Sequence, residues 1–229
     1  MDLKLISKKI RKTILNTIYT AKTGHIGGSL SCVDILISLY FGKHLKFDPK
    51  KPKLEDRDRL IVSKGHATAA YYSVLAHLGF IKISELQTYC RNNTRLATHL
   101  SGSVPGVEFD TGSLGHGLGI ACGLAYSAKI DKKKYKVFAL ISDGELYEGS
   151  VWEALLFASH YKLNNLVIIV DRNNQIVMDK TEDCIKLNPL EKKFKSFGYK
   201  TFQVNGHSFK DLDKVFKKIR KKKNSPTTV

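Results

Sequence analysis

Short apolar runs alternate with helix-like segments along most of this 229-residue chain. Runs such as "RLIVS" (59–63), "KVFALIS" (136–142) and "NLVIIV" (165–170) have the length of buried strands. Strands that alternate with helices are typical of βαβ units, whose crossover helices cover both faces of a parallel sheet. The sequence therefore predicts an α/β fold, with a parallel sheet and helices on both faces.

The other expected elements complete this pattern. A fourth strand is expected at "YKTFQV" (199–204), and the final "NSPTTV" (224–229) indicates the start of another strand. A chain of this length forms one sizeable core, so we expect a single domain over residues 1–229. Helices are expected at 3–21, 31–42, 67–79, within 110–130, 150–162, 190–198 and 209–223.

The composition is that of a soluble globular protein, with 42% hydrophobic and 26% charged residues. No apolar run approaches the length of a membrane span, and the lysine-rich N-terminal segment lacks the apolar block of a signal peptide. The cysteines form no Cys-x-x-Cys pair, which favours free thiols in a reducing cytoplasm. We therefore expect a cytoplasmic protein without membrane contact. The cysteines are Cys32, Cys90, Cys122 and Cys184.

The net charge of +17 has two interpretations. It could be the electrostatic footprint of a nucleic-acid-binding protein. The basic residues are mostly lysines spread along the chain, however, and they form no recognisable nucleic-acid-binding motif. A solvated lysine-rich surface is therefore favoured, and it would also attract anionic metabolites or an acidic partner chain.

Polar clusters follow each expected strand at the point where it ends. In open α/β sheets, ligands bind at the carboxyl ends of the strands. Loops are polar in any protein, so one such cluster means little, but four on one edge favour a ligand site. The clusters are Lys64-Gly65-His66, Asp143-Gly144-Glu145, Asp171-Arg172-Asn173 and Asn205-Gly206-His207.

Asp143 and Asn173 are candidates for a metal site. One helical crossover separates them, so their strands can be neighbours and their side-chain oxygens can converge. A carboxylate, an amide oxygen and a main-chain carbonyl suit Mg²⁺ or Ca²⁺, and Mg²⁺ completes its shell with phosphate oxygens and water. Alternatively, Asp143 caps the following helix and Asn173 forms an Asx turn.

The segment "TGSLGHGLG" (111–119) carries four glycines directly before a helix. Free N–H groups at a helix N-terminus bind phosphate, so the segment is a candidate anion site. It lacks the preceding strand that a dinucleotide fingerprint requires. Close packing of a small-residue helix against the sheet is the alternative interpretation.

Four histidines lie beside glycine or in polar turns, where they could transfer protons or donate to phosphate. A single turn histidine is usually only a surface residue. No nucleophilic triad emerges from the sequence, which a phosphorylated cofactor with its own reactive carbon would explain. The histidines are His25, His66, His99 and His207.

The segment "SDGELYEGSVWEALLFASHYKLNNLVIIVDRNN" resembles the thiamine diphosphate motif, in which Gly-Asp-Gly is followed about thirty residues later by Asn. More specifically, the chain resembles the N-terminal, diphosphate-binding domain of transketolase. The resemblance extends over nearly the whole sequence, through "TGHIGGSLSCVDIL", "LIVSKGHATAAYYSVLAHLG", "THLSGSVPGVEFDTGSLGHGLGIACGLA", "KTEDCIKLNPLEKKFKSFGY" and "VNGHS".

This resemblance implies thiamine diphosphate and Mg²⁺ as cofactors. It implies that Mg²⁺ binds the side chains of Asp143 and Asn173 and the main-chain carbonyl of Gln175. The implied contacts to thiamine diphosphate are His66, Gly112, Ser113, Leu114, Gly144, Asn173 and His207.

The resemblance also implies residues for substrate and for assembly. His25, His99 and His207 would contact the sugar, and His25 and His207 would assist proton transfers at the reacting carbon. Glu148 and Glu153 match family carboxylates near the subunit interface.

Three positions depart from the family pattern. Ser142 replaces the first Gly of Gly-Asp-Gly, Gln175 replaces an aliphatic residue, and Asn205 replaces an Asp before Gly206-His207. The first two changes are expected to be tolerated because neither side chain would ligate the metal. The third would alter the surroundings of His207.

In the family, the glutamate that activates the cofactor lies in a second, pyrimidine-binding domain. This sequence ends before any such domain, and within the expected last strand of its own. The resemblance thus implies either an enzyme split over two polypeptides or a truncated sequence. We expect a partner subunit that carries the pyrimidine-binding domain, a heterotetramer, and no activity from the chain alone.

The expected reaction is transfer of a two-carbon ketol unit between sugar phosphates, in central carbon metabolism such as the pentose phosphate pathway or in a specialised sugar pathway. One alternative is a subunit of another thiamine diphosphate enzyme, such as a 2-oxo acid dehydrogenase or decarboxylase. The three histidines that match substrate-contacting positions favour sugars. A non-catalytic basic binding protein is the alternative from a different class.

Overall fold

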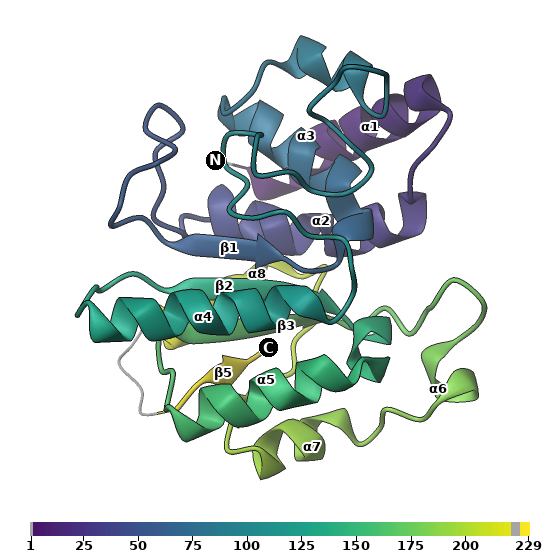
Figure 1. Ribbon diagram of the computed structural model, residues 1–229. Coiled ribbons are helices and arrows are strands. Elements are labelled where there is room, and N and C mark those ends of the chain that lie inside the picture. The colour runs from purple at the N-terminus through teal and green to yellow at the C-terminus, as the bar shows by residue number, and fades with distance from the viewer. Residues whose placement is uncertain (1, 221–224) are drawn as a thin grey trace.

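A parallel sheet lies at the centre of the computed structural model, which describes residues 2–220 and 225–229 (Figure 1). Within these residues the sheet has five strands in the order β1-β2-β3-β5-β4. The predicted α/β fold with a parallel sheet is therefore confirmed. The strands are β1 Arg59–Val62, β2 Val137–Ser142, β3 Leu166–Asp171, β4 Lys200–Thr201 and β5 Thr227–Thr228.

Helices cover both faces of the sheet (Figure 1). One layer contains α1 Leu3–Ala21, α2 Ile26–Tyr40, α3 Thr68–Leu78 and α8 Phe209–Arg220. The opposite layer contains α4 His116–Ile130, α5 Gly149–His160 and α7 Leu190–Ser196. Shorter helical turns are η1 Gly65–Ala67, η2 Ile83–Thr88, η3 Gly144–Tyr147 and α6 Thr181–Cys184.

Successive residues of the central strands face opposite layers, which explains why these strands are apolar except at their ends. Leu140 of β2 packs in the core under α1, α2, α3 and α8, whereas its neighbours Ala139 and Ile141 pack in the core under α4 and α5. All six residues of β2 are buried. Burial on both faces fixes the strand ends in space, and the candidate site lies at those ends.

Helix α2 begins earlier than predicted. The prediction began at residue 31, but the helix starts at Ile26 and includes Gly27 and Gly28. Two glycines lower helix propensity, so the sequence pattern concealed this turn. Gly28 has a packing reason to be there, because a Cβ at this position would lie 2.5 Å from the ring of His66.

The C-terminal elements differ from the prediction in extent. Strand β4 has two residues rather than the six predicted at 199–204, because its pairing is limited to the equally short β5. The expected final strand is present as β5, which lies between β3 and β4. Helix α8 is described to Arg220, and the predicted helical residues 221–223 lie outside the described residues.

Among the described residues, no helix combines the length and the apolar character needed to span a membrane.

Candidate active site

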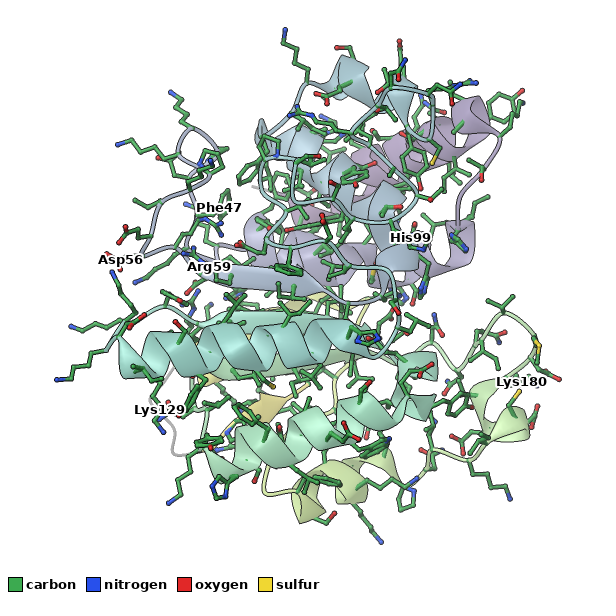
Figure 2. All side chains as sticks on the ribbon, in the orientation of Figure 1. Phe47, Asp56, Arg59, His99, Lys129 and Lys180 are labelled. Atoms are coloured by element: carbon green, nitrogen blue, oxygen red, sulfur yellow. The ribbon has the colours of Figure 1, made fainter. Side chains whose placement is uncertain are left out.

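The ends of β1, β2 and β3 meet at one edge of the sheet. The register pairs Val62 with Leu140 and Ser142 with Asp171, so the residues that follow the three strands become neighbours. Figure 2 places His99 on this side, whereas Asp56 and Arg59 lie on the opposite side. Three of the four strand exits noted in the sequence, those after β1, β2 and β3, therefore lie side by side.

Asp143 is fully buried where β2 ends. Its Oδ1 accepts a hydrogen bond from the N–H of Gly144 (3.0 Å), and its Oδ2 accepts one from the N–H of Asn174 (2.8 Å). The latter bond ties the loop after β3 directly to Asp143. Burial raises the pKa of the Asp143 carboxyl, against the opposing effects of the Asn174 N–H and the Arg172 guanidinium.

Asn173 lies in the same loop, and its Oδ1 accepts a hydrogen bond from the N–H of Gln175 (2.9 Å). Both alternatives from the sequence are therefore present, since Asp143 caps η3 and Asn173 forms an Asx turn. These bonds do not exclude a metal, because each carboxylate or amide oxygen has a second lone pair. A nearby divalent cation would favour the ionised carboxylate that burial disfavours.

The donor set fits Mg²⁺ better than a transition metal. One carboxylate, one amide oxygen and one main-chain carbonyl are hard oxygen ligands, and they leave positions open for phosphate oxygens and water. In the part of the chain that the structure describes, no group of three or more His, Cys, Asp or Glu side chains could hold a metal ion. A zinc-type site is therefore absent from that part.

The glycine segment before α4 provides backbone that side chains cannot block. A Cβ on Gly65 would lie 2.3 Å from the Cα of Gly112, so these two segments touch through their backbones. Gly115 caps α4 with φ of 88°, a conformation that favours glycine. The turn 112–114 precedes a 15-residue helix, which makes it suitable for binding a phosphate.

Three of the four predicted histidines lie around this turn. The rings of His25 and His66 meet edge to face with centroids 5.8 Å apart. A Cβ on Gly112 would lie 2.5 Å from the ring of His99. Burial lowers the pKa of His66 to about 4, with further effects from Lys64 and His25. His66 is therefore neutral at pH 7, whereas His25 and His99 are exposed and accessible to a ligand.

His207 has different surroundings. Its Nδ1 lies 2.8 Å from Oδ2 of Asp34, a buried carboxylate that also binds Ser7 and Arg11 of α1. Among the contacts of the described residues, none joins His207 to His25, His66 or His99. The structure thus brings three of the predicted histidines together, and the place of His207 beside them stays a prediction.

A buried ion pair at this edge was missed by sequence reasoning. Lys64 is fully buried, and its ammonium group contacts Oδ2 of Asp171. The other oxygen of Asp171 accepts a hydrogen bond from Ser31 of α2 (2.7 Å). The pair fixes the exits of β1 and β3 relative to each other. In the sequence, only the position of both residues at strand ends indicated that they could form a pair.

Glu145 is a second missed residue. It is fully buried, and one carboxylate oxygen accepts hydrogen bonds from the hydroxyl of Ser63 and from the N–H of Gly115 (2.9 Å). The other oxygen accepts a bond from the N–H of Ser142 (3.3 Å). Glu145 thereby fixes the glycine turn to the ends of β1 and β2. The sequence placed Glu145 in the polar cluster with Asp143, but it did not indicate that Glu145 binds the glycine turn.

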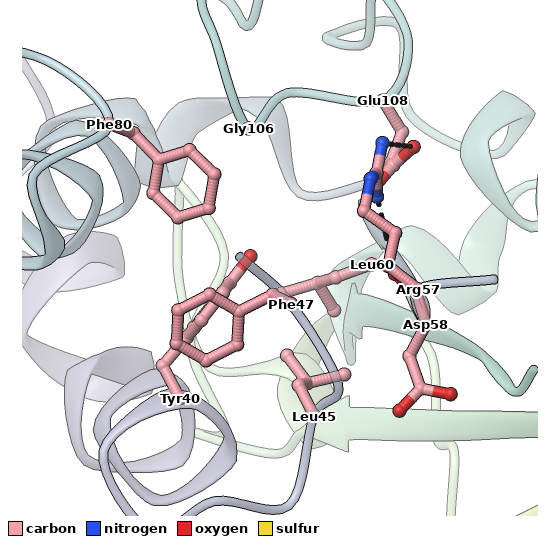
Figure 3. Close-up of a pocket in the computed structure, with 9 residues that line it drawn as sticks. All are labelled: Tyr40, Leu45, Phe47, Arg57, Asp58, Leu60, Phe80, Gly106 and Glu108. Carbon is pink, nitrogen blue, oxygen red and sulfur yellow. Dashed lines mark hydrogen bonds and ion pairs between the residues drawn. The ribbon is translucent and has the colours of Figure 1, made fainter. Parts of the chain in front are cut away.

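Two cavities lie elsewhere. One encloses about 10 Å³, room for one water molecule, between the rings of Tyr40, Phe47 and Phe80 and the ion pair of Arg57 with Glu108 (Figure 3). A groove of about 390 Å³ lies between residues 202–205 and α8. The groove is lined by Asn205 of the fourth polar cluster, but neither cavity is lined by a residue for which the resemblance implies contact with cofactor, metal or substrate. The strand-end cluster is therefore the better candidate.

Glu148 and Glu153 are exposed at the start of α5. Four large apolar side chains are exposed along α4 and α5 and at the end of α5. They are Ile130 (62% exposed), Leu156 (61%), Phe157 (37%) and Tyr161 (38%). We call these four residues, with the exposed Gly119 and Gly123 of α4, the α4–α5 face. A Cβ on either glycine would meet no atom within 4 Å, so the backbone of α4 is open to close approach.

Comparisons with known proteins identify the family of the chain. The family described as "Transketolase, thiamine diphosphate binding domain" matches residues 3–229. One of the subunits of apulose-4-phosphate transketolase from Phocaeicola vulgatus is 41% identical over 217 residues, which is 95% of this chain and 77% of that protein. 6-Deoxy-6-sulfo-D-fructose transketolase subunit SqwG of a Clostridium species is 34% identical over 230 residues, covering 100% of this chain and 83% of that protein.

The crystal structure of transketolase from Campylobacter jejuni superposes with a TM-score of 0.94 at 30% identity. The match covers 100% of this chain and 38% of that transketolase. The chain thus spans little more than a third of such a transketolase, and most of the length of the Phocaeicola and Clostridium proteins. It belongs to the transketolase family, as a thiamine diphosphate-binding domain.

Proposed function

We propose that this chain is the thiamine diphosphate-binding subunit of a two-chain transketolase, which transfers a ketol unit between sugar phosphates. One observation carries the proposal: Asp143, the glycine turn at Gly112 and the pair His25–His66 converge at the carboxyl edge of β1, β2 and β3. Similarity to proteins named as single transketolase subunits, along 95% or more of the chain, supports the two-chain organisation.

The oxygen ligands suit Mg²⁺ in this role. Asp143 and Asn173 would hold the ion through side chains and Gln175 through its carbonyl, while Asn173 would also contact the cofactor. Gly112, Ser113, Leu114 and Gly144 would bind the diphosphate through the backbone. Gly144 has no room for a larger residue, because a Cβ there would lie 2.7 Å from the side chain of Ile176.

Thiamine diphosphate, when bound, supplies the nucleophilic carbon that accepts the two-carbon unit. The contribution of this chain is to bind, orient and exchange protons. Neutral His66 can donate one hydrogen bond and accept another, without adding positive charge beside Mg²⁺. His25 and His99 are exposed beside it and can move protons on the sugar hydroxyls.

The donor and the acceptor of the ketol unit are proposed to be sugar phosphates. The Phocaeicola and Clostridium relatives are named for apulose-4-phosphate and for 6-deoxy-6-sulfo-D-fructose, which favours a specialised sugar pathway over the pentose phosphate pathway for this chain. Steady-state assay of the reconstituted enzyme with xylulose 5-phosphate against pyruvate as donor tests the reaction class. Turnover of pyruvate without turnover of xylulose 5-phosphate would contradict ketol transfer.

The histidines can be ranked by substitution. With the partner chain present, His25→Ala should lower kcat/KM about a hundredfold, because a proton-transferring group is lost. His207→Ala should lower it less than about tenfold, because one ring nitrogen of His207 is already paired with Asp34. Steady-state kinetics of both variants, with cofactor affinity measured separately, provides the comparison. Equally large losses of kcat/KM in the two variants would instead support a role for His207 at the reacting carbon, as the sequence resemblance implied.

The α4–α5 face is proposed to join two copies of the chain, which would give a heterotetramer with two partner subunits. Apolar side chains exposed next to an open glycine backbone favour close helix packing. We expect Leu156→Asp to halve the mass of the assembled enzyme in light scattering. Leu5→Asp, at a similarly exposed leucine of α1 in the opposite helix layer, should leave the mass unchanged. An unaltered mass for Leu156→Asp would contradict this interface.

A further inference from the structure

Arg172 lies between two carboxylates at the exit of β3. One guanidinium nitrogen lies 3.4 Å from Oδ2 of Asp143, and another lies 2.6 Å from Oε1 of Glu182. The side chain is only 22% exposed, so water screens its charge incompletely. A cation of the protein itself thus stands beside the carboxylate that is proposed to bind Mg²⁺.

Glu182 binds a different nitrogen of this guanidinium from the one that lies nearest Asp143. It lies in the short helix α6, and its Oε1 also accepts hydrogen bonds from the N–H groups of Leu187 (3.1 Å) and Asn188 (3.2 Å). Burial acts to raise the pKa of Glu182, but the bond from Arg172 and the two backbone donors outweigh it and lower the pKa. Glu182 is therefore ionised at neutral pH and is itself held in place.

The contacts of Arg172 are unequal. The bond to Glu182 is short, whereas the contact to Asp143 is long and lies at the limit of a hydrogen bond. The carboxylate oxygens of Asp143 are engaged by backbone N–H groups instead. Arg172 therefore contributes charge to the site more than it contributes a bond.

A divalent cation bound by Asp143 and Asn173 would experience repulsion from Arg172 and attraction to Glu182. We propose that Arg172 and Glu182 together set the affinity of this site for its divalent cation. Arg172 weakens binding, and Glu182 limits that effect by holding the guanidinium away from Asp143. Arg172 also partly compensates the buried carboxylate when no cation is bound. This inference depends on the proposed cofactor function.

The test is a titration of the full chain with Mg²⁺ at a fixed concentration of thiamine diphosphate, with calorimetry as the readout. Arg172→Gln should lower the free Mg²⁺ concentration at half-saturation by about tenfold, because it removes a poorly screened positive charge. Glu182→Gln should raise that concentration by roughly threefold to tenfold, because it releases the guanidinium toward Asp143. Lys192→Gln, which removes an exposed charge on α7, should leave it unchanged.

The opposite signs distinguish this role from a structural one, since a residue needed only for loop packing would weaken Mg²⁺ binding in both variants. Unchanged or weaker binding in Arg172→Gln overturns the inference. Should that variant not fold, as judged by its thermal midpoint, unchanged binding in Glu182→Gln overturns it equally. Mg²⁺-independent cofactor binding by the wild-type chain would overturn both this inference and the proposed metal site.

Discussion

Asp143→Ala is expected to weaken Mg²⁺-dependent binding of thiamine diphosphate by at least about a hundredfold, because it removes the only carboxylate of the proposed ligand set. The remaining ligands, Asn173 and the carbonyl of Gln175, are neutral oxygens. They cannot offset the cost of dehydrating a small divalent cation. Calorimetric titration of the variant at constant free Mg²⁺ measures the loss.

The fold requires a separate control, because Asp143 also accepts backbone hydrogen bonds. In the alanine variant, the partly buried N–H groups of Gly144 and Asn174 lose their acceptor, which costs at most about 1–3 kcal/mol of stability, the range for a fully buried donor. Asp143→Asn keeps one acceptor oxygen and removes the charge. It should retain a thermal midpoint closer to wild type and still lose the cofactor.

Asp131→Ala is the matched control for charge. Asp131 is exposed at the C-terminal end of α4, on the edge away from the site, so its removal changes the net charge equally. Binding should then remain at the wild-type level. Retention of wild-type affinity by both Asp143 variants would contradict the metal assignment.

The parts of the fold that could be predicted are those with a strong periodic signal. β2 and β3 are apolar up to their last residues, Ser142 and Asp171, because they are buried on both faces, and this run is visible in the sequence. The start of α2 was hidden because Gly27 and Gly28 disfavour helix locally while tertiary packing requires Gly28 to be small. Local propensity cannot report such a contact.

The candidate site was predictable where chain topology alone brings residues together. Asp143 and Asn173 follow strands that one crossover joins, so their proximity follows from the fold class. The histidines lack such a constraint, since the turn of His207 resembles that of His66 in sequence but packs against Asp34 instead. The pairing of Lys64 with Asp171 was missed because lysine is rarely buried without a partner, and the partner lies 107 residues away in the sequence.

The chain on its own is expected to catalyse ketol transfer at least about a thousandfold more slowly than it does with its partner chain, because it would lack a proton-transferring carboxylate on the cofactor ring. The family resemblance assigns that carboxylate to the pyrimidine-binding domain. The buried carboxylates that the structure describes at this edge are already engaged: Asp143 by backbone N–H groups, Glu145 by Ser63 and Gly115, and Asp171 by Lys64 and Ser31.

Freeing Glu145 for the cofactor would leave buried donors without an acceptor, freeing Asp171 would leave the buried Lys64 without its counter-ion, and freeing Asp143 would remove the acceptor of two partly buried N–H groups. Activity should therefore appear only when a second chain, co-purified from the native host, is added back. Single-turnover assays with xylulose 5-phosphate, with and without that chain and at saturating thiamine diphosphate and Mg²⁺, measure the difference. Cofactor binding by the chain alone with no turnover is the expected pattern, whereas full ketol transfer by the purified chain would refute the two-chain proposal.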